Sequence, residues 1–219
     1  MQPSLLAFMG GSFDPVHQGH IATALALQQQ LDGAEFYLMP AFVSPLKAQS
    51  TAAHHRLAML QLAIAAQPSL QIETLELQQN APSYTIYSLE ALRQRYGQQQ
   101  ALAFVMGMDS FLQLPHWYRW QELTDYGHLI VMTRPTYRAD FSEDLQQWLN
   151  SRRCQQQKML RYSANGLVFF AQTPLYALSS TAIRQQLATS AAQITGLNSA
   201  VLDYIYSHQL YGATHTHES

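Results

Sequence analysis

The stretch from Gly10 to His20 combines residue types that suit phosphate chemistry. It holds two adjacent glycines, Gly10 and Gly11, and two histidines, His17 and His20, three residues apart. Glycine lets backbone N–H groups approach a phosphate without a Cβ in the way, and the start of a helix adds unpaired N–H donors and a partial positive charge. Two imidazoles at this spacing can face the same side as a helix begins. The stretch therefore predicts a phosphate-binding loop with two imidazole donors.

The position of this loop supports the same interpretation. The apolar run 5–9 before it is typical of a buried strand that ends in a tight turn, and helical spacing follows to about Leu31. Open α/β sheets bind ligands where their strands end in this way. The loop is neither a Gly-x-Gly-x-x-Gly fingerprint nor a Walker loop, since no Gly-x-x-x-x-Gly-Lys-Ser/Thr occurs in the chain. The alternative, in which one histidine caps the helix and the other packs in the core, is typical of a lone histidine rather than of this pair.

A second candidate anion site lies far along the chain, at Ser179-Ser180-Thr181. Serine and threonine are strong N-cap residues, and the N–H groups that follow them can bind an anion. Arg184 comes one helical turn later, and its planar fork suits phosphate oxygens. Taken alone, the segment is better explained as an ordinary capped helix with a solvated arginine. Together with the first motif, it favours a second phosphate contact.

Two further charged residues follow strands that the sequence predicts. Asp109 comes just after the apolar run 101–106 and Gly107, and Arg134 follows the apolar run 128–132. The position of Asp109 fits a carboxylate at the ligand edge of a sheet and, equally well, a helix N-cap. Arg134 is a further phosphate candidate at the same edge.

An aromatic pair, Trp117 and Tyr118, stands in a loop beside a proline. An aromatic side chain in such a loop either covers the core or forms a platform for a flat ring. Composition alone favours the first alternative, a side chain that covers the core.

Lys47 is one of only two lysines in the chain. A solvated loop charge is the ordinary interpretation of such a residue.

Expected strands and helices alternate along the whole chain. Strands are expected at 5–9, 36–39, 70–72, 101–106, 128–132 and 166–170, and helices at 21–31, 56–66, 86–96, 120–126, 145–149, 181–187 and 200–210. Several strands are apolar throughout, as expected for parallel strands covered on both faces. The pattern predicts one doubly wound α/β domain at residues 1–212, with a mainly parallel sheet and C-terminal helices. The polar, glutamine-rich stretch 135–157 is expected to be a surface excursion, and the tail 213–219 to be disordered.

Composition narrows the classes of function. The chain has 219 residues, with 12 Lys and Arg against 14 Asp and Glu, and it carries a net charge of −2. It therefore lacks a general attraction for nucleic acid or an anionic membrane, and any anion needs a local site. No segment approaches the roughly 18 apolar residues of a bilayer span, and the N-terminus lacks the basic region of a signal peptide. Cys154 is the single cysteine, which excludes an internal disulfide and fits a cytoplasmic location.

The string His17-Gln18-Gly19-His20 resembles the signature of the nucleotidyltransferases with a His/Thr-x-Gly-His motif. The longer stretch from Gly10 resembles the bacterial nicotinate-mononucleotide adenylyltransferases. The resemblance implies a Rossmann-like fold and transfer of AMP from ATP to nicotinate mononucleotide. The residues that it implies in ATP binding are Gly10, Gly11, Ser12, Phe13, His17, Gly19, His20, Gly107, Asp109, Ser180, Thr181 and Arg184. The catalytic roles that it implies fall on His17, His20, Asp109 and Arg184.

The same resemblance implies an acceptor site. Trp117 is expected to stack on the pyridine ring of nicotinate mononucleotide, and the backbone N–H groups of Thr85 and Tyr118 to meet its carboxylate. Lys47 is expected to help neutralise a substrate phosphate. The family usually has a Pro-Pro-His-Lys/Arg string here, whereas this chain has Leu46 in the place of the histidine. The role of that histidine is lost or taken by another residue.

The expected partners are ATP and nicotinate mononucleotide, with Mg²⁺ bound mainly through the phosphates of ATP. Neither a nucleic acid nor a membrane is expected as a partner, and the sequence leaves a homo-oligomer open. Two alternative functions also stay open. One is the same chemistry on nicotinamide mononucleotide or pantetheine phosphate. The other is a module that binds ATP or NAD without turnover.

Overall fold

The computed structural model describes residues 4–42, 50–78, 83–133, 140–174, 176, 178–189 and 193–213. Lys47, Leu46, Arg134 and most of the expected tail lie outside these residues. The strands are β1 (Leu5–Gly11), β2 (Glu35–Pro40), β3 (Leu70–Ile72), β4 (Ala101–Gly107), β5 (His128–Thr133), β6 (Arg153–Cys154) and β7 (Val168–Gln172). The α-helices are α1 (Gln18–Gln30), α2 (Ala53–Ile64), α3 (Leu75–Gln78), α4 (Thr85–Tyr96), α5 (Met108–Leu112), α6 (Leu123–Tyr126), α7 (Glu143–Asn150), α8 (Ser180–Ala188) and α9 (Ser199–Ser207).

The strands form one sheet in the order β3-β2-β1-β4-β5-β7-β6, and every pairing in the described part is parallel. The chain first moves outward from β1 to β3 and then returns to place β4 on the other side of β1. The direction of winding therefore reverses between β1 and β4, which is where open α/β sheets bind ligands. The predicted doubly wound, parallel α/β fold is confirmed.

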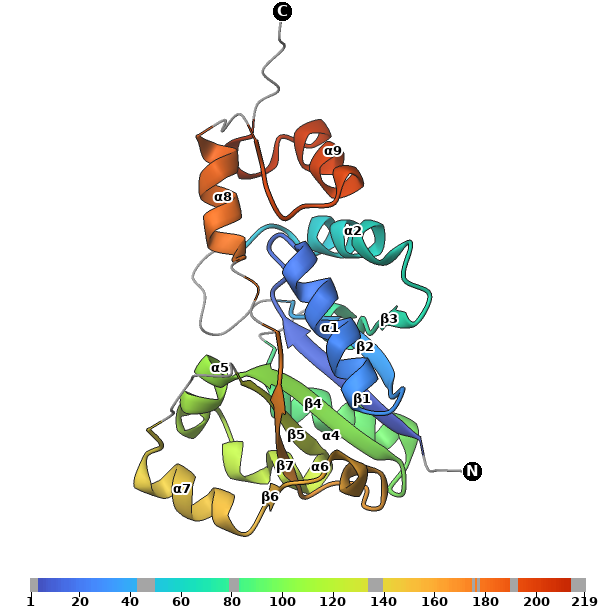
Figure 1. The fold of residues 1–219 in the computed structure, drawn as a ribbon, viewed down its shortest axis with the longest axis vertical. Coiled ribbons are helices and arrows are strands. Elements are labelled where there is room, and N and C mark those ends of the chain that lie inside the picture. Colours follow the sequence, from blue (N-terminus) through green and yellow to red (C-terminus); the bar gives the residue numbers. More distant parts are fainter. Residues whose placement is uncertain are drawn as a thin grey trace, which may run out of the picture.

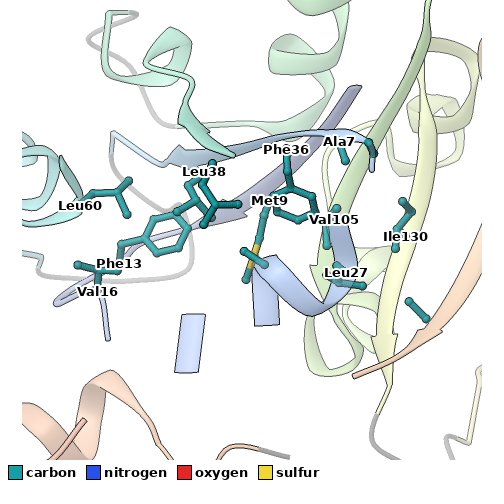
Figure 2. Packing of buried hydrophobic residues seen from close by; sticks show 14 of the residues in the cluster. Ala7, Met9, Phe13, Val16, Leu27, Phe36, Leu38, Leu60, Val105 and Ile130 are labelled. Atoms are coloured by element: carbon teal, nitrogen blue, oxygen red, sulfur yellow. The ribbon is translucent and has the colours of Figure 1, made fainter. Parts of the chain in front are cut away.

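The sheet has a hydrophobic core on each face, because alternate residues of a strand point to opposite sides. Leu5, Ala7 and Met9 of β1 belong to the core under α1, α2, α8 and α9, which Figure 2 shows in part. Leu6 and Phe8 belong to the core under α4 to α7. Figure 1 shows α2, α8 and α9 together at one end of the molecule. None of the helices in the described ranges combines the length and the apolar character that a membrane crossing requires.

The stretch 135–157 differs from the expected surface excursion. Its described part contains α7, whose predicted position is confirmed, and the short strand β6. Leu145, Trp148 and Leu149 are buried in the second core, so this part of the chain belongs to the packed domain. The stretch is polar because α7 buries only one stripe, which takes three of its eight residues, while the other five are exposed to water.

The C-terminal helix is also shorter than expected. Helix α9 ends at Ser207, and a separate 3-10 turn follows at Leu210–Gly212. The expected helix at 120–126 is likewise a 3-10 turn, Trp120–Glu122, followed by the short α6. Further 3-10 turns lie at Leu114–His116 and Gln157–Arg161. The sequence pattern does not predict α3 or α5, since helices of four and five residues carry little periodic signal.

Candidate active site

The carboxyl ends of β1 and β4 lie side by side, with Met9 paired to Val105. A Cβ on Gly10 would lie 2.5 Å from an atom of the Phe104 ring on β4, so a larger residue would displace that ring. Gly107, which follows Met106 at the end of β4, has open space where a Cβ would be. The glycine requirement at Gly10 therefore comes from strand packing, whereas Gly107 leaves room beside the site.

Two cavities open at these strand ends. The first has a volume of about 360 Å³ and is lined by Gly10, Gly11, Ser12, Ala41, Glu76, Ser83, Tyr84, Thr85, Phe104, Met106, Gly107, Ser110, His116, Trp117 and Tyr118. The second has a volume of about 460 Å³ and is lined by Met9, Gly11, Ser12, His17, Gly19, His20, Thr23, Gly107, Met108, Asp109, Met132, Thr173, Pro174, Tyr176, Leu178, Ser179, Ser180 and Thr181. Gly11, Ser12 and Gly107 line both cavities. The two cavities therefore meet where the winding of the sheet reverses.

His17 and His20 both line the second cavity. His17 is the N-cap residue of α1, and its ring stacks on that of His20 with 3.7 Å between the centroids. Gly19 allows this arrangement, since a Cβ there would lie 3.0 Å from His17 Nδ1. His17 thus occupies the N-cap position of α1 and also lines the second cavity. Gly19 leaves the space that the His17 ring needs.

A backbone hydrogen bond fixes the tautomer of His20. The N–H of His17 donates to His20 Nδ1 over 3.2 Å, which completes a capping-box bond. Because Nδ1 accepts, the neutral ring carries its proton on Nε2. The edge of the Phe13 ring packs against His20 at 5.1 Å. His20 Nε2 is therefore the donor nitrogen of this ring, and Phe13 lies in the core beside it rather than in the wall of either cavity.

Burial holds His17 in its neutral form. Its side chain is 7% exposed, and desolvation lowers its pKa to about 4. Nδ1 of His17 is buried and has no hydrogen-bond partner among the described atoms. His128, which lies at the start of β5, also has its pKa lowered to about 4 by burial.

We expect acid to destabilise the protein through these two histidines. An unfolded histidine has a pKa of about 6.5, so the unfolded chain binds more protons between about pH 6.5 and pH 4, and stability falls as the pH is lowered through that range. Each histidine is expected to cost about 2 kcal/mol of unfolding free energy at pH 5 relative to neutral pH. Urea unfolding at both pH values measures this loss. His17→Asn should remove about half of it, and an undiminished loss in that variant would contradict the assignment.

The second motif docks against the histidine loop. Ser179 caps α8 by accepting from the N–H of Ala182 over 3.1 Å. The hydroxyl of Ser180 donates to the carbonyl of Pro15 over 2.9 Å. Ser180 and Thr181 both line the second cavity. The structure thus brings two motifs, joined by a contact across 165 positions, to the same cavity.

Arg184 supports this contact without lining either cavity in the described structure. Its Nη1 donates to the carbonyl of Asp14 over 2.6 Å, and its Nη2 donates to the hydroxyl of Thr181 over 3.2 Å. The carboxylate of Asp14 accepts in turn from the hydroxyl of Tyr211, over 2.6 Å. Neither Asp14 nor Tyr211 is a predicted site residue, since their contact joins positions 197 residues apart.

Asp109 lies in the first turn of α5, which Gly107 caps, and it is exposed at the second cavity. The N-cap alternative for Asp109 is therefore wrong. Asp109 is the only carboxylate that lines this cavity among the described residues, and no lysine or arginine among them lines it. The groups that this cavity offers to an anion are imidazoles, hydroxyls and the N–H groups at helix starts, all of them without a full positive charge. They suit an anion whose charge is partly neutralised by cations that bind together with it.

Aromatic side chains surround the mouth of the first cavity. Tyr84 and Tyr118 are partly exposed and pack edge to face, with 5.6 Å between their ring centroids. Trp117 packs partly on the second core, and its buried Nε1 has no hydrogen-bond partner in the described structure. Thr85 is the first residue of α4, where backbone N–H groups are unpaired within the helix. Trp117 therefore both covers the core and faces the cavity.

Sequence reasoning missed one charged residue of the first cavity. Glu76 on α3 is 4% exposed, and it accepts a hydrogen bond from the Ser88 hydroxyl over 2.7 Å. Desolvation raises the pKa of this carboxyl group. A single glutamate on a four-residue helix gives no pattern that the sequence could reveal. Its burial depends on α4 packing over it.

Comparison with known proteins gives consistent results. Residues 8–186 match the family model described as cytidylyltransferase-like. The chain is 41% identical over 211 residues to a Pectobacterium atrosepticum protein named "Probable nicotinate-nucleotide adenylyltransferase", which covers 95% of this chain and 99% of that protein. A Yersinia pestis protein of the same name is 40% identical over 210 residues, covering 95% of this chain and 96% of that protein.

Solved structures share the fold. The structure titled Plasmodium falciparum nicotinic acid mononucleotide adenylyltransferase complexed with NaAD has a TM-score of 0.72 at 17% identity, covering 95% of this chain and 98% of that one. The same enzyme complexed with APC has a TM-score of 0.70 at 18% identity, with the same coverage. The sequence identities to the bacterial proteins carry the family assignment, and the structures agree with it in fold. The chain belongs to the nicotinate-nucleotide adenylyltransferase family of cytidylyltransferase-like nucleotidyltransferases.

Proposed function

We propose that this protein transfers AMP from ATP to nicotinate mononucleotide, forming deamido-NAD and pyrophosphate. The observation that carries the proposal is the pair of cavities that meet at Gly11, Ser12 and Gly107. One cavity holds the paired imidazoles and the start of α8, and the other holds the aromatic side chains. Two substrates bound in this way would bring their phosphates together at the shared wall. The names of the relatives and of the solved structures with NaAD and APC support the same ligands.

The reaction requires alignment more than proton transfer. An oxygen of the 5′-phosphate of nicotinate mononucleotide attacks the α-phosphorus of ATP, the bond to the β-phosphate oxygen breaks, and pyrophosphate leaves with that electron pair. The attacking phosphate is ionised at neutral pH, so no general base is required. Holding the two phosphates in line and stabilising the charge that develops then supply the catalysis.

The residues of the second cavity take the following roles in this proposal. His20 donates its Nε2–H to a non-bridging oxygen of the α-phosphate, and the neutral His17 lies stacked beside it. Ser180 and Thr181, with the start of α8, hold the departing phosphates. Arg184 adds its positive charge next to Thr181. Asp109 faces the ribose or the metal-bound phosphates.

The donor set of the second cavity fits a divalent metal that arrives with ATP. Mg²⁺ keeps several waters and is bound through one or two carboxylates together with substrate phosphates. Asp109 supplies one exposed carboxylate, and no group of three or more acidic, histidine or cysteine side chains in the described ranges could hold a metal. When bound, Mg²⁺ would neutralise phosphate charge. We propose that Asp109 is the protein group nearest to it.

In the first cavity, we propose that Trp117 stacks on the pyridine ring and that the N–H groups of Thr85 and Tyr118 meet its carboxylate. Neutral donors favour an acid over its amide, because the NH₂ group of the amide would face a donor and stay unpaired. Glu76 also lines this cavity, and desolvation raises the pKa of its carboxyl group. Lys47 and Arg134 remain candidates for the acceptor phosphate.

A coupled pyrophosphate assay with three acceptors tests the function. We expect rapid pyrophosphate release with nicotinate mononucleotide, and much slower release with nicotinamide mononucleotide or pantetheine phosphate. Faster turnover of pantetheine phosphate would overturn the acceptor assignment. ATP binding without pyrophosphate release on any acceptor would favour the nucleotide-binding module.

Fractionation of the cells that make this protein would test the cytoplasmic location that we propose from its lone cysteine.

A further inference from the structure

Arg56 on α2 is a buried charge that the proposed reaction does not use. Its side chain is 1% exposed. Nε donates to the carbonyl of Thr51 over 2.8 Å, Nη1 to that of Ser12 over 2.8 Å, and Nη2 to that of Phe42 over 2.6 Å. No carboxylate forms a salt bridge with it among the described residues. Within the described part of the chain its guanidinium donates to main-chain carbonyls alone, and it thereby fixes the backbone of three separate segments.

Two of these segments line the cavities or adjoin their lining residues. Ser12 lies in the wall that both cavities share, and Phe42 follows Ala41 of the first cavity. The N–H of Phe42 donates to the hydroxyl of Ser83 over 2.9 Å, and Ser83 also lines the first cavity, two residues before Thr85. A continuous set of hydrogen bonds thus runs from the shared wall, through Arg56, to the acceptor side.

A second buried arginine provides a natural comparison. Arg93 on α4 is 3% exposed, and among the residues that the structure describes its guanidinium donates only to carbonyls, those of Gly97, Gln100, Tyr126 and Ala164. Gln100 and Tyr126 come just before β4 and β5, so Arg93 binds segments at the amino ends of the strands. Arg56 binds segments that follow the carboxyl ends of β1 and β2. The two residues share burial and chemistry, but only Arg56 lies at the edge that holds the cavities.

We propose that Arg56 is a positioning residue for adenylyl transfer, which holds the Ser12 carbonyl and the Phe42 carbonyl so that the two cavities keep their alignment. The inference rests on the proposed function. In-line attack depends on the relative placement of two phosphates, and a misplacement of 1 Å can lower the rate about 100-fold. Arg56 contacts neither substrate in this proposal. It acts through the backbone of the loops that do.

The test compares Arg56→Lys with Arg93→Lys. A lysine keeps the charge and loses the fork that reaches several carbonyls, so both variants are expected to lose thermal stability. We expect Arg56→Lys to lower kcat about 10- to 100-fold at a temperature where it is folded. We expect Arg93→Lys to keep a kcat close to that of the wild type. Equal kcat values in the two variants, matched for stability, would overturn the inference.

Ser83→Ala gives a second measurement if Arg56→Lys does not fold. It removes the hydroxyl that accepts from Phe42 and leaves the contacts of Arg56 intact. We expect it to raise KM for nicotinate mononucleotide and to leave binding of a non-hydrolysable ATP analogue unchanged in calorimetry. An unchanged KM would overturn the link between Arg56 and the acceptor side. A failure of the proposed function would be distinguishable from a failure of this inference about Arg56, because the wild-type protein itself would then release no pyrophosphate.

Discussion

His20→Ala is expected to lower kcat at least about 100-fold without changing the fold. His20 is fixed as an Nε2–H donor by the N–H of His17, and removal of one such donor at a developing charge costs about 100- to 1,000-fold in other enzymes. Pyrophosphate release measures the rate, and circular dichroism measures the fold. A near-wild-type rate with an intact spectrum would contradict the role of His20.

Two variants sharpen this test. His20→Gln keeps an N–H donor on a side chain of similar reach, so we expect it to recover part of the lost rate. His54→Ala removes an exposed histidine on α2 that lines neither cavity. We expect a wild-type rate from it.

Trp117→Ala is expected to lower kcat/KM for nicotinate mononucleotide about 10- to 100-fold, because stacking of a base on an aromatic side chain contributes about 1 to 3 kcal/mol. The Trp117 ring lies between the second core and the first cavity. KM for ATP should change little, since Trp117 does not line the second cavity. Steady-state kinetics with each substrate varied in turn measures both values.

Trp117→Phe separates the ring from its N–H group. Phenylalanine keeps a ring for stacking and removes Nε1, which has no partner among the described atoms. A partial loss in Trp117→Phe would assign that donor to the ligand. Trp120→Ala is the matched control, because Trp120 packs on Trp148 at 5.2 Å and lines neither cavity. A larger loss of kcat/KM in Trp120→Ala than in Trp117→Ala would show that these effects come from stability alone.

The sequence predicted the fold class and several of the residues that line the second cavity, because the signals are local. Strand and helix periodicity repeat over a few residues, and the histidines of the first motif stand on consecutive turns of one helix start. His17 occupies the N-cap position of α1, as the cap interpretation expects, and it also lines the second cavity, whereas its contact with a phosphate stays a prediction. Such local features do not depend on how distant segments pack.

Other features depended on packing and could not be predicted. The stretch around Trp148 contains few apolar residues, yet it buries three of them where α7 meets the second core. The reason for Gly10 is similar, since the ring that excludes a Cβ belongs to Phe104 on the neighbouring strand. In both cases the partner of the residue lies on another element, and the pairing of strands decides which element that is.

By itself, the sequence determined that two candidate phosphate-binding motifs stand at helix starts, and that strands and helices alternate in a way that builds a parallel sheet. Only the tertiary structure decided which groups hold the motifs in place. Tyr211 reaches Asp14 across 197 positions, and Arg56 joins Ser12 to a segment that follows another strand. A single tyrosine or arginine looks the same in sequence whether it is solvated or buried. Its role arises because the winding of the sheet brings distant carbonyls and carboxylates within hydrogen-bond reach.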